Sequence, residues 1–548
     1  MTEEIQDIFD EIRNIMQPDM DCTARYHALD ALLLRALKDR TRHSPVDFTH
    51  TAARLHWLCK QTGHPSHPLE VFRARAGRIQ KGLFLPDGED EAYDLKAVCE
   101  GLAAFYQTHV PEDVQKRLPR HWRPAPAPAE KVSQAKRIRI TVHRWGEHFI
   151  YGKDHTHPTE QLLKVEYADE TDRTFADLKE QLYEGAQLNL LSVKTIKAEG
   201  AYPYVLKPEM LVLDPDFLID ITALCACIKP YGYSAYTHLL NKLAPPARSA
   251  AIQLGNAANQ FLDDCVNENR DLERAKTSEN EVFRLGSAER ERFIQNRDLE
   301  REDRACPESA GHERFTQNAD GTAEAELYLR SMQNSFRLSP LAWSTLPDID
   351  RDFFNRCEMQ FHHIRQTVRN SFSAAGIDIR QTEVELEPSF LCEALGLQGR
   401  MDLLTRNADK LVELKSGKAD EYPYRSPKDE HRLQMALYKE ILYYNLDRRH
   451  EQVQSYLFYS RYPGLYAVDV PRSHIRRAMA LRNAILHIEH RLRRGESRAL
   501  IDELTEERLN VDGRGDRLYT RYLRPRMMEI LTPLHGMRGT EADYFHRF

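Results

Sequence analysis

The segment from Leu395 to Lys418 constrains the fold of this chain more than any other. It holds two apolar stretches, one ending in Asp402-Leu-Leu and one beginning with Leu-Val-Glu413, joined by the polar turn Thr-Arg-Asn-Ala-Asp-Lys. Apolar stretches on both sides of a short polar turn predict a β-hairpin. With the turn centred between positions 407 and 408, a symmetric register places Asp402 opposite Glu413.

This pair of opposed carboxylates predicts a metal site. Opposed residues have Cβ atoms about 4.5–5.5 Å apart, and two carboxylates at that distance repel unless a proton or a cation lies between them. Mg²⁺ or Mn²⁺ suits such a pair, because it binds carboxylate oxygens, water and phosphate together. Side chains alternate along a strand, so Lys415 projects to the same side as Glu413. We therefore predict Asp402 and Glu413 as metal ligands, with Lys415 positioning water or stabilising charge on a phosphate.

A helix is predicted after the hairpin, beginning at about Asp429. His431, Gln434 and Tyr438 are spaced three and four residues apart, so they share one face of that helix. There they could bind a phosphate or orient Lys415. Alternatively, they form a polar stripe at the helix edge, with Tyr438 packed partly into the core. The functional interpretation is favoured because the Asp, the turn, Glu-x-Lys and Gln-x-x-x-Tyr occur together in one order.

Size and composition indicate a multidomain globular protein. The chain has 548 residues, 41% hydrophobic and 29% charged, so several domains with buried cores are expected. No stretch approaches the roughly 18 uncharged apolar residues of a membrane-spanning helix. The acidic N-terminus lacks the features of a secretory signal, so we expect a cytoplasmic protein with no membrane partner. The formal net charge of −7 argues against coating nucleic acid by bulk electrostatics but leaves a local basic groove open.

Periodicity and linkers divide the chain into four regions. Helical periodicity precedes a linker rich in Pro and Ala, and polar–apolar alternation then predicts short antiparallel strands in a small barrel or sheet. A later stretch with charges of both signs is typical of a solvated helical insertion. The predicted regions are a helical N-terminal domain at 1–122, a β-rich barrel-like domain at 131–215, the domain of the hairpin at 216–470 with its charged insertion at about 268–325, and a helical C-terminal region at 471–548.

Several polar residues outside the hairpin have two interpretations. His155 and His157 could bind a metal, but a His-x-His in a polar loop is more often solvated surface. The nine cysteines are scattered and show no zinc-ligand spacing. The C-terminal region carries arginines that could face nucleic acid or form an ordinary wet surface: Arg476, Arg477, Arg482, Arg491, Arg493 and Arg494.

At the hairpin and the following helix, the chain resembles the RecB-type branch of the PD-(D/E)XK nucleases. It is most similar to the nuclease half of the flap-processing replication helicase-nucleases and to their bacterial relatives. The match is carried by Leu-Gly-Leu-Gln-Gly-Arg-Met-Asp402, by Val-Glu413-Leu-Lys415-Ser-Gly-Lys and by Gln434-Met-Ala-Leu-Tyr438.

The resemblance implies a fold and roles for these residues. The fold is multidomain α+β, with a restriction-endonuclease-like α/β nuclease core at 216–470 beside the helical and barrel-like domains. Asp402, Glu413 and the carbonyl of Leu414 are implied as metal ligands and Lys415 as the catalytic lysine. The Gln-x-x-x-Tyr pair is implied to be the branch-specific motif.

Further candidate ligands follow from the same resemblance. Family members often carry a metal-binding His on an earlier helix that opens with Gly, and the matching stretch here is Gly-Asn-Ala-Ala-Asn259. Asn259 therefore stands where His is usual, with Asp263 or Asp264 as candidate substitutes. Glu385 and Glu387, on the strand before the hairpin, are candidates as well, although they fit solvent-facing strand positions equally.

Two features of some relatives are missing from the sequence. A four-cysteine iron–sulfur cluster needs three cysteines after the catalytic lysine, and no cysteine follows Cys392, so no cluster is expected. No Gly-x-x-x-x-Gly-Lys-Ser/Thr motif occurs, so a helicase motor would lie beyond Phe548 or on a partner.

Together these features predict a metal-dependent deoxyribonuclease. Single-stranded ends or flaps of DNA are the expected substrate, in replication, repair or recombination. Two alternatives stay open: a nuclease of phage defence, and a non-catalytic nucleic-acid-binding subunit of a helicase complex. The intact Asp402, Glu413 and Lys415 favour an enzyme over the second alternative.

Overall fold

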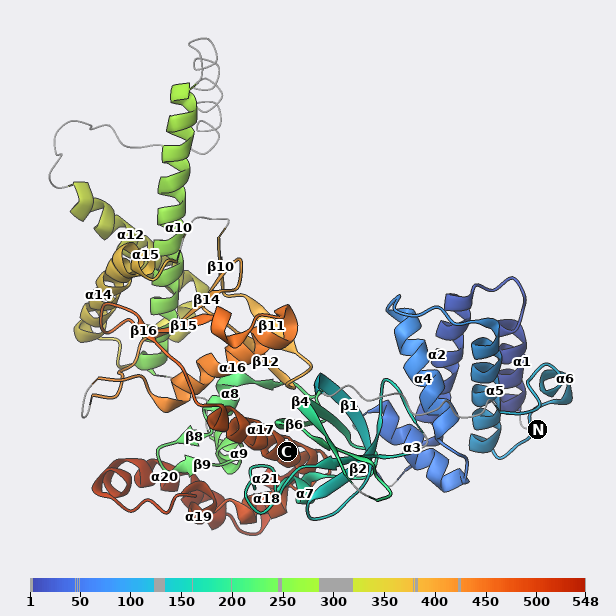
Figure 1. Cartoon of the computed structure of the whole chain (residues 1–548). Coiled ribbons are helices and arrows are strands. Elements are labelled where there is room, and N and C mark those ends of the chain that lie inside the picture. Colours follow the sequence, from blue (N-terminus) through green and yellow to red (C-terminus); the bar gives the residue numbers. More distant parts are fainter. Residues whose placement is uncertain are drawn as a thin grey trace. The chain divides into compact units, whose positions relative to one another are not determined.

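The chain divides into two compact units. Figure 1 draws the whole chain with its helices and strands labelled. The computed structural model describes residues 3–547 except 45, 47, 49, 123–133, 160, 199, 245–248, 285–318, 378, 380–382 and 422–424. Unit 1 comprises Met1–Asn241, Leu391–Leu397 and Arg472–Phe548, and unit 2 comprises Lys242–Phe390 and Gln398–Pro471. The predicted mixture of helices and strands is confirmed. Among the described residues, no helix is long and apolar enough to cross a membrane.

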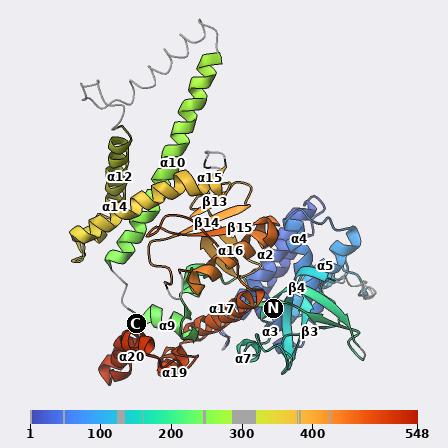
Figure 2. The same cartoon turned by 60° about the vertical axis from the view of Figure 1, so that its left-hand side comes forward.

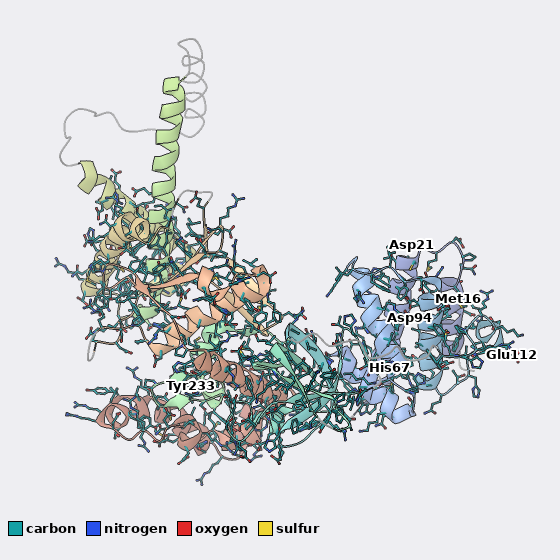
Figure 3. All side chains as sticks on the ribbon, in the orientation of Figure 1. Met16, Asp21, His67, Asp94, Glu112 and Tyr233 are labelled. Carbon is teal, nitrogen blue, oxygen red and sulfur yellow. The ribbon has the colours of Figure 1, made fainter. Side chains whose placement is uncertain are left out.

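Unit 1 begins with a bundle of helices that share one apolar core. The helices are α1 (Glu3–Ile15), α2 (Cys22–Arg40), α3 (Thr51–Thr62), α4 (His67–Gln80), α5 (Gly88–Phe105) and α6 (Glu112–Gln115). Asp21 and Asp87 begin α2 and α5, because each carboxylate accepts a hydrogen bond from the third N–H after it. The buried carboxylate of Asp94 (labelled in Figure 3) accepts hydrogen bonds from Tyr26 Oη at 2.6 Å and Arg75 Nη1 at 2.7 Å.

A small closed barrel follows in unit 1. Its strands are β1 (Gln134–Trp145), β2 (Phe149–Asp154), β3 (Leu163–Glu166), β4 (Gln187–Lys197), β5 (Tyr204–Lys207) and β6 (Met210–Leu213), with α7 (Leu178–Gln181) before β4. The order β1-β2-β3-β5-β4 returns to β1, so five strands close a ring and β6 adds beside β4. β3 and β5 run parallel, so the prediction of antiparallel strands is wrong for this pair. Alternation along a strand indicates which face is buried but not the direction of its neighbour.

The remaining elements of unit 1 are short strands and C-terminal helices. They are β7 (Ile219–Asp220), α8 (Ile221–Cys225), β8 (Ile228–Lys229), β9 (Gly232–Tyr233), α9 (Tyr236–Leu243), α17 (Arg472–Arg493), α18 (Ser497–Glu503), α19 (Glu506–Leu509), η3 (Tyr519–Leu523), α20 (Arg524–Gly536) and α21 (Thr540–Arg547). α17 packs along β6, where the side chain of Asn483 bonds both to the N–H of Leu213 and to the carbonyl of Leu211.

The arginines of the C-terminal region divide into exposed and engaged ones: Arg477, Arg493 and Arg494 lie on the surface, whereas Arg482 does not. Arg482 is fully buried, and its guanidinium donates to the carbonyls of Leu213, Asp214 and Phe217. Arg491 forms a two-pronged ion pair with Glu503. Further arginines are also engaged: Arg476 pairs with Asp172, Arg494 with Glu496, Arg477 lies over the Tyr233 ring and Arg493 over the Phe217 ring. Sequence spacing alone could not show this, because most partners lie far away in the chain.

Unit 2 combines long helices with a five-stranded sheet. Its helices are α10 (Ala250–Arg284), α12 (Ala319–Leu338), α13 (Pro340–Ser344), α14 (Arg351–Gln366), η1 (Thr367–Ser371), α15 (Phe372–Ala374), α16 (Asp429–Leu446) and η2 (His450–Gln452). α10 and α14 pack against each other (Figure 2). Of the predicted charged insertion at 268–325, residues 268–284 continue α10 and 319–325 begin α12, while 285–318 lie outside the described residues.

The sheet of unit 2 has helices on both faces. Its strands are β10 (Val384–Leu386), β13 (Leu403–Thr405), β14 (Lys410–Lys415), β15 (Gln454–Tyr459) and β16 (Tyr466–Ala467), in that order, with the hairpin β11 (Ser389–Cys392) and β12 (Leu397–Arg400) preceding β13. β14 and β15 run parallel and α16 connects them. Leu403, Val412 and Leu414 join the apolar core formed with α10 and α14. Side chains of the alternate positions on β14 therefore face α16.

Candidate active site

The hairpin register places Asp402 across from Glu413. Leu403 pairs with Val412, and Leu404 pairs with Leu411, which is the register predicted from the turn. Asp402 precedes β13 in a bend of the chain. Its Oδ2 accepts a hydrogen bond from the N–H of Leu414 at 2.6 Å, so the carboxylate is fixed against β14.

Glu413 is buried and only one of its two carboxylate oxygens is satisfied. Oε1 accepts hydrogen bonds from Lys415 Nζ and Gln434 Nε2, each at 2.8 Å. Oε2 is buried and has no hydrogen-bond partner among the described residues. A buried carboxylate oxygen without a partner is costly, and a bound cation is one way to satisfy it.

The charges around Asp402 and Glu413 are those expected of a cation site without its cation. Burial raises the pKa of Asp402 well above its usual value, and the charge of Glu413 raises it further, while Lys415 and the Leu414 N–H act in the opposite direction. Two carboxylates and an unpartnered oxygen match the hard oxygen ligands of Mg²⁺ or Mn²⁺. The residues present therefore fit a divalent cation, and Asp402 and Glu413 would hold it.

The predicted face of α16 contacts the carboxylate pair through the hydrogen bond from Gln434 to Glu413. Gln434 and Tyr438 are both buried on α16, and Gln434 Nε2 also lies 3.0 Å from Tyr438 Oη. The Tyr438 hydroxyl donates to the carbonyl of Arg400 at 2.6 Å, two residues before Asp402. One chain of hydrogen bonds thus runs from the segment before Asp402 through α16 to Glu413.

His431 lies one turn before Gln434 on α16 and contacts Tyr459 instead of the carboxylate pair. Its Nδ1 lies 2.8 Å from the hydroxyl of Tyr459. Burial lowers the pKa of His431 to about 3, and the charges of Lys415 and Lys428 lower it further. The imidazole is therefore neutral at pH 7, within the electrostatic reach of Lys415.

Glu387 pairs with Asp402 on the neighbouring segment of the sheet. Its N–H donates to the carbonyl of Asp402 at 3.0 Å, which continues the pairing of β10 with β13. The charge of Glu387 also contributes to the raised pKa of Asp402. Its carboxylate is engaged by Arg400 Nη1 at 3.0 Å, and its φ of 51° is unusual for a residue other than Gly or Asn. Glu385, two residues earlier, is exposed.

The candidates on the earlier helix lie in a different layer. Asn259 and Asp263 are half-buried on α10, whose apolar residues pack on the face of the sheet opposite α16. Asp264 accepts a hydrogen bond from Gln260 at 3.0 Å. The start of α10 nevertheless approaches the site, because a Cβ on Gly255 would lie 3.3 Å from Ser416 Oγ, just after Lys415.

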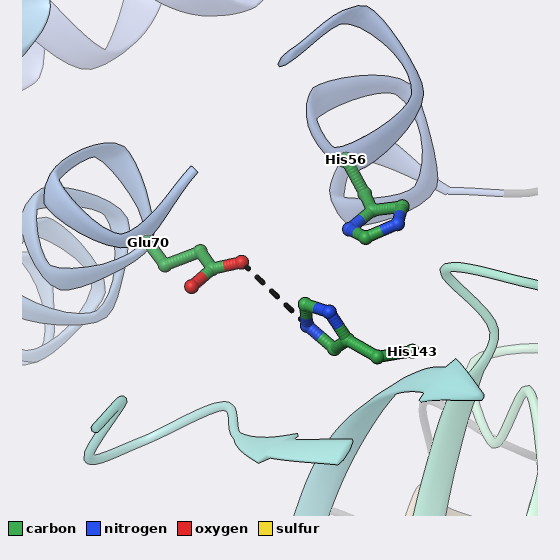
Figure 4. A group of neighbouring side chains, drawn as sticks. All are labelled: His56, Glu70 and His143. Carbon is green, nitrogen blue, oxygen red and sulfur yellow. Dashed lines mark ion pairs between the residues drawn. The ribbon is translucent and has the colours of Figure 1, made fainter. Parts of the chain in front are cut away.

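A second cluster of metal-binding residue types lies in unit 1. His56 on α3, Glu70 on α4 and His143 on β1 place their ligand atoms within 4.8 Å of one another (Figure 4). Neither His56 Nδ1 nor His143 Nε2 has a hydrogen-bond partner among the described residues. Burial and the His56 ring lower the pKa of His143 to about 4. No pattern in the sequence indicated this cluster, because its members come from three separate elements.

That cluster is a weaker metal centre than the carboxylate pair. Glu70 Oε2 already binds the largely buried ammonium of Lys153 at 2.9 Å, so a divalent cation would lie beside a positive charge. The predicted alternative histidines, His155 and His157, are exposed and do not belong to it.

Comparison with known protein families agrees with this geometry. The family model described as the PD-(D/E)XK nuclease superfamily matches residues 221–508, more than half of the chain and including β13, β14 and α16. No curated protein is similar enough to the chain to add to the comparison. A nuclease acting on nucleic acid, of a superfamily that typically uses divalent metal ions, is thereby indicated. The chain belongs to the PD-(D/E)XK nuclease superfamily.

Proposed function

We propose that the chain is a Mg²⁺- or Mn²⁺-dependent deoxyribonuclease of the RecB type that hydrolyses phosphodiester bonds at single-stranded ends or flaps. The observation that carries this proposal is the unpartnered, buried Oε2 of Glu413, a residue whose strand position lies opposite Asp402, with the Lys415 ammonium 2.8 Å from Oε1. A non-catalytic subunit would have no need for an ion-pair arrangement that leaves a buried carboxylate oxygen unsatisfied.

The metal and Lys415 have separate tasks in this proposal. A divalent cation held by Asp402 and Glu413, with the Leu414 carbonyl as a third proposed ligand, would supply Lewis-acid polarisation of a phosphate. Lys415 stabilises negative charge on the phosphate oxygens as the P–O bond to the leaving group breaks, and it orients the attacking water. Its hydrogen bond to Glu413 holds the ammonium in place before substrate binds.

Gln434 and Tyr438 are positioning residues in this scheme. Gln434 fixes the rotamer of Glu413, and Tyr438 links Gln434 to the backbone at Arg400. The geometry of the carboxylate pair therefore depends on the α16 face, and small displacements at a metal site lower rates strongly. Glu387 is proposed to tune the charge around the pair, because its carboxylate raises the pKa of Asp402. His431 is proposed as a further site residue that stays uncharged beside Lys415.

The test is cleavage of labelled single-stranded and flapped DNA. We expect cleavage with Mg²⁺ or Mn²⁺ and none in EDTA, and we expect Asp402→Ala and Lys415→Ala each to abolish it. Asp429→Ala is a matched control, because Asp429 is a carboxylate at the solvent-exposed start of α16. Undiminished cleavage in EDTA, or near wild-type single-turnover rates for either active-site variant, would show that this assignment is wrong.

A further inference from the structure

The barrel of unit 1 carries aromatic and cationic side chains together on one outer face. In the strand register, Tyr151 on β2 pairs with Arg144 on β1 and with Lys164 on β3. The Arg144 guanidinium lies 4.5 Å from the centre of the Tyr151 ring, and Lys164 Nζ lies 3.9 Å from the centre of the Phe149 ring. Tyr202, from the loop between β4 and β5, lies 5.3 Å from Tyr151 between ring centres and accepts a hydrogen bond from Arg144 at 3.0 Å.

The charges of this face are available to a ligand. Arg144 is exposed, Lys164 is partly exposed, and no carboxylate within the described ranges lies at ion-pair distance from either. The nearby carboxylates of Glu166 and Asp169 share the Lys207 ammonium, at 3.1 and 2.9 Å, so with Arg144 and Lys164 these five side chains carry three positive and two negative charges. A net positive surface beside partly exposed rings remains.

We propose that this face, which we term the barrel face (Arg144, Phe149, Tyr151, Lys164 and Tyr202), binds single-stranded nucleic acid. Partly exposed rings offer stacking to any base, and interleaved cations attract the phosphates. Five-stranded barrels of the OB type bind oligonucleotides through strands 2 and 3 and the loops after strands 1 and 4. The barrel face lies on β2, β3 and the β4–β5 loop, so its position and its chemistry agree.

The chemistry of the face selects unpaired over paired strands. The bases of a duplex are stacked on one another, so they present their faces to a protein ring only when unpaired. A duplex would leave the rings of Tyr151, Phe149 and Tyr202 without a function and would use only the two cations. This inference rests on the proposed function in one respect: the strand bound here is the substrate of the nuclease site.

Binding is measured with the full chain in EDTA, where cleavage is blocked. The probe is a fluorescein-labelled oligothymidylate of about 16 nucleotides, the upper site size for one such barrel. Tyr151→Ala and Tyr202→Ala are each expected to raise Kd roughly 5- to 150-fold, which corresponds to the loss of one stacked base. Tyr151→Phe keeps the ring and should bind like the wild type.

The matched control is Tyr522→Ala. Tyr522 is an exposed tyrosine outside the barrel with Arg521 over its ring, so the same side-chain type and the same cation–π pair are lost. Kd should not change. Arg144→Gln and Lys164→Gln should each lower the slope of log Kd against log salt concentration by about 0.7, the value for one phosphate contact on a single strand.

The outcomes separate this inference from the proposed nuclease activity. Unchanged Kd for both Tyr151→Ala and Tyr202→Ala overturns the barrel face, even if the wild type cleaves DNA with Mg²⁺. Equal sensitivity of a blunt duplex probe to Tyr151→Ala overturns the preference for single strands. If the wild type cleaves nothing but both variants lose binding, the barrel face stands and the nuclease proposal fails.

Discussion

Asp402→Asn should change the stability of unit 2 in opposite directions with and without metal. Asn keeps an oxygen that can accept the Leu414 N–H but removes the charge that faces Glu413. At an effective dielectric constant of 20, two like charges about 5 Å apart repel by about 3 kcal/mol. Lys415 offsets much of this repulsion, because its ammonium also attracts Asp402. We therefore expect the metal-free variant to gain about 1 kcal/mol in free energy of unfolding, or about 2–4 °C in Tm.

Adding Mg²⁺ should reverse the order. A ligand at 100 times its Kd stabilises the folded state by about 2.7 kcal/mol, so the wild type should gain several degrees in Tm. The variant lacks one of the two carboxylates and should gain little. Thermal unfolding is followed by differential scanning fluorimetry in EDTA and in a Mg²⁺ titration, with Asp429→Asn as the control because Asp429 is an exposed carboxylate at the start of α16 in the same unit.

Two results would refute this reasoning. One is a metal-free Asp402→Asn protein that melts below the wild type, which would mean that the carboxylates do not repel in the folded state. The other is an equal Mg²⁺-induced shift in the wild type and the variant, which would locate metal binding elsewhere, for instance at His56 and Glu70 in unit 1.

Three further predictions concern other contacts of the structure. Gln434→Ala should lower the single-turnover cleavage rate about 10- to 100-fold with little change in DNA affinity. Tyr438→Phe should lower the same rate and also the free energy of unfolding, by about 1 kcal/mol, because it removes a buried hydroxyl that donates to the Arg400 carbonyl and accepts from Gln434. Single-turnover rates equal to that of the wild type for both variants would mean that this helix face is structural only. Arg482→Met should lower the free energy of unfolding of unit 1 by about 2–4 kcal/mol, because it leaves buried carbonyls without a hydrogen-bond donor. An unchanged melting curve would contradict this. Folding raises the pKa of Asp402 above its value of about 3.9 in the unfolded chain. Protonation of Asp402 therefore stabilises the folded state fully below about pH 3.9, and this stabilisation is lost as the pH rises through the folded-state pKa. The metal-free advantage of Asp402→Asn should therefore shrink on acidification, as measured by Tm against pH, and a constant difference would speak against the raised pKa.

The local parts of the site were predictable because they depend on short-range geometry. Turn length sets the register of a hairpin, and the observed pairing of Leu403 with Val412 is the predicted one. Helical periodicity placed Gln434 and Tyr438 on one face, and both side chains lie together on α16. That the face turns toward Glu413 depends on how α16 packs on the sheet, which spacing along the helix does not determine.

The features that were predicted wrongly or missed depend on contacts between segments far apart in the sequence. Arg482 belongs to a run of arginines typical of a solvated surface, yet three of the carbonyls that it binds lie more than 260 residues earlier and a fourth, that of Gly396, lies 86 residues earlier. The parallel pairing of β3 with β5 also joins non-consecutive strands. The cluster of His56, Glu70 and His143 needs three elements to meet before its members become neighbours. Patterns in a single sequence do not show which distant segments come into contact.

The packing of α17 on β6 has a consequence for how the protein is made. Arg482 satisfies the carbonyl of Leu213 from 269 positions later in the chain, so the ribosome must synthesise all of unit 2 before this side of the barrel is complete. At about 5–20 residues per second, the delay is roughly 15–50 s. During that time the barrel strands emerge with an open, partly apolar side. A nascent chain stalled before Arg472 should therefore recruit chaperones at the barrel, and release should coincide with translation of α17.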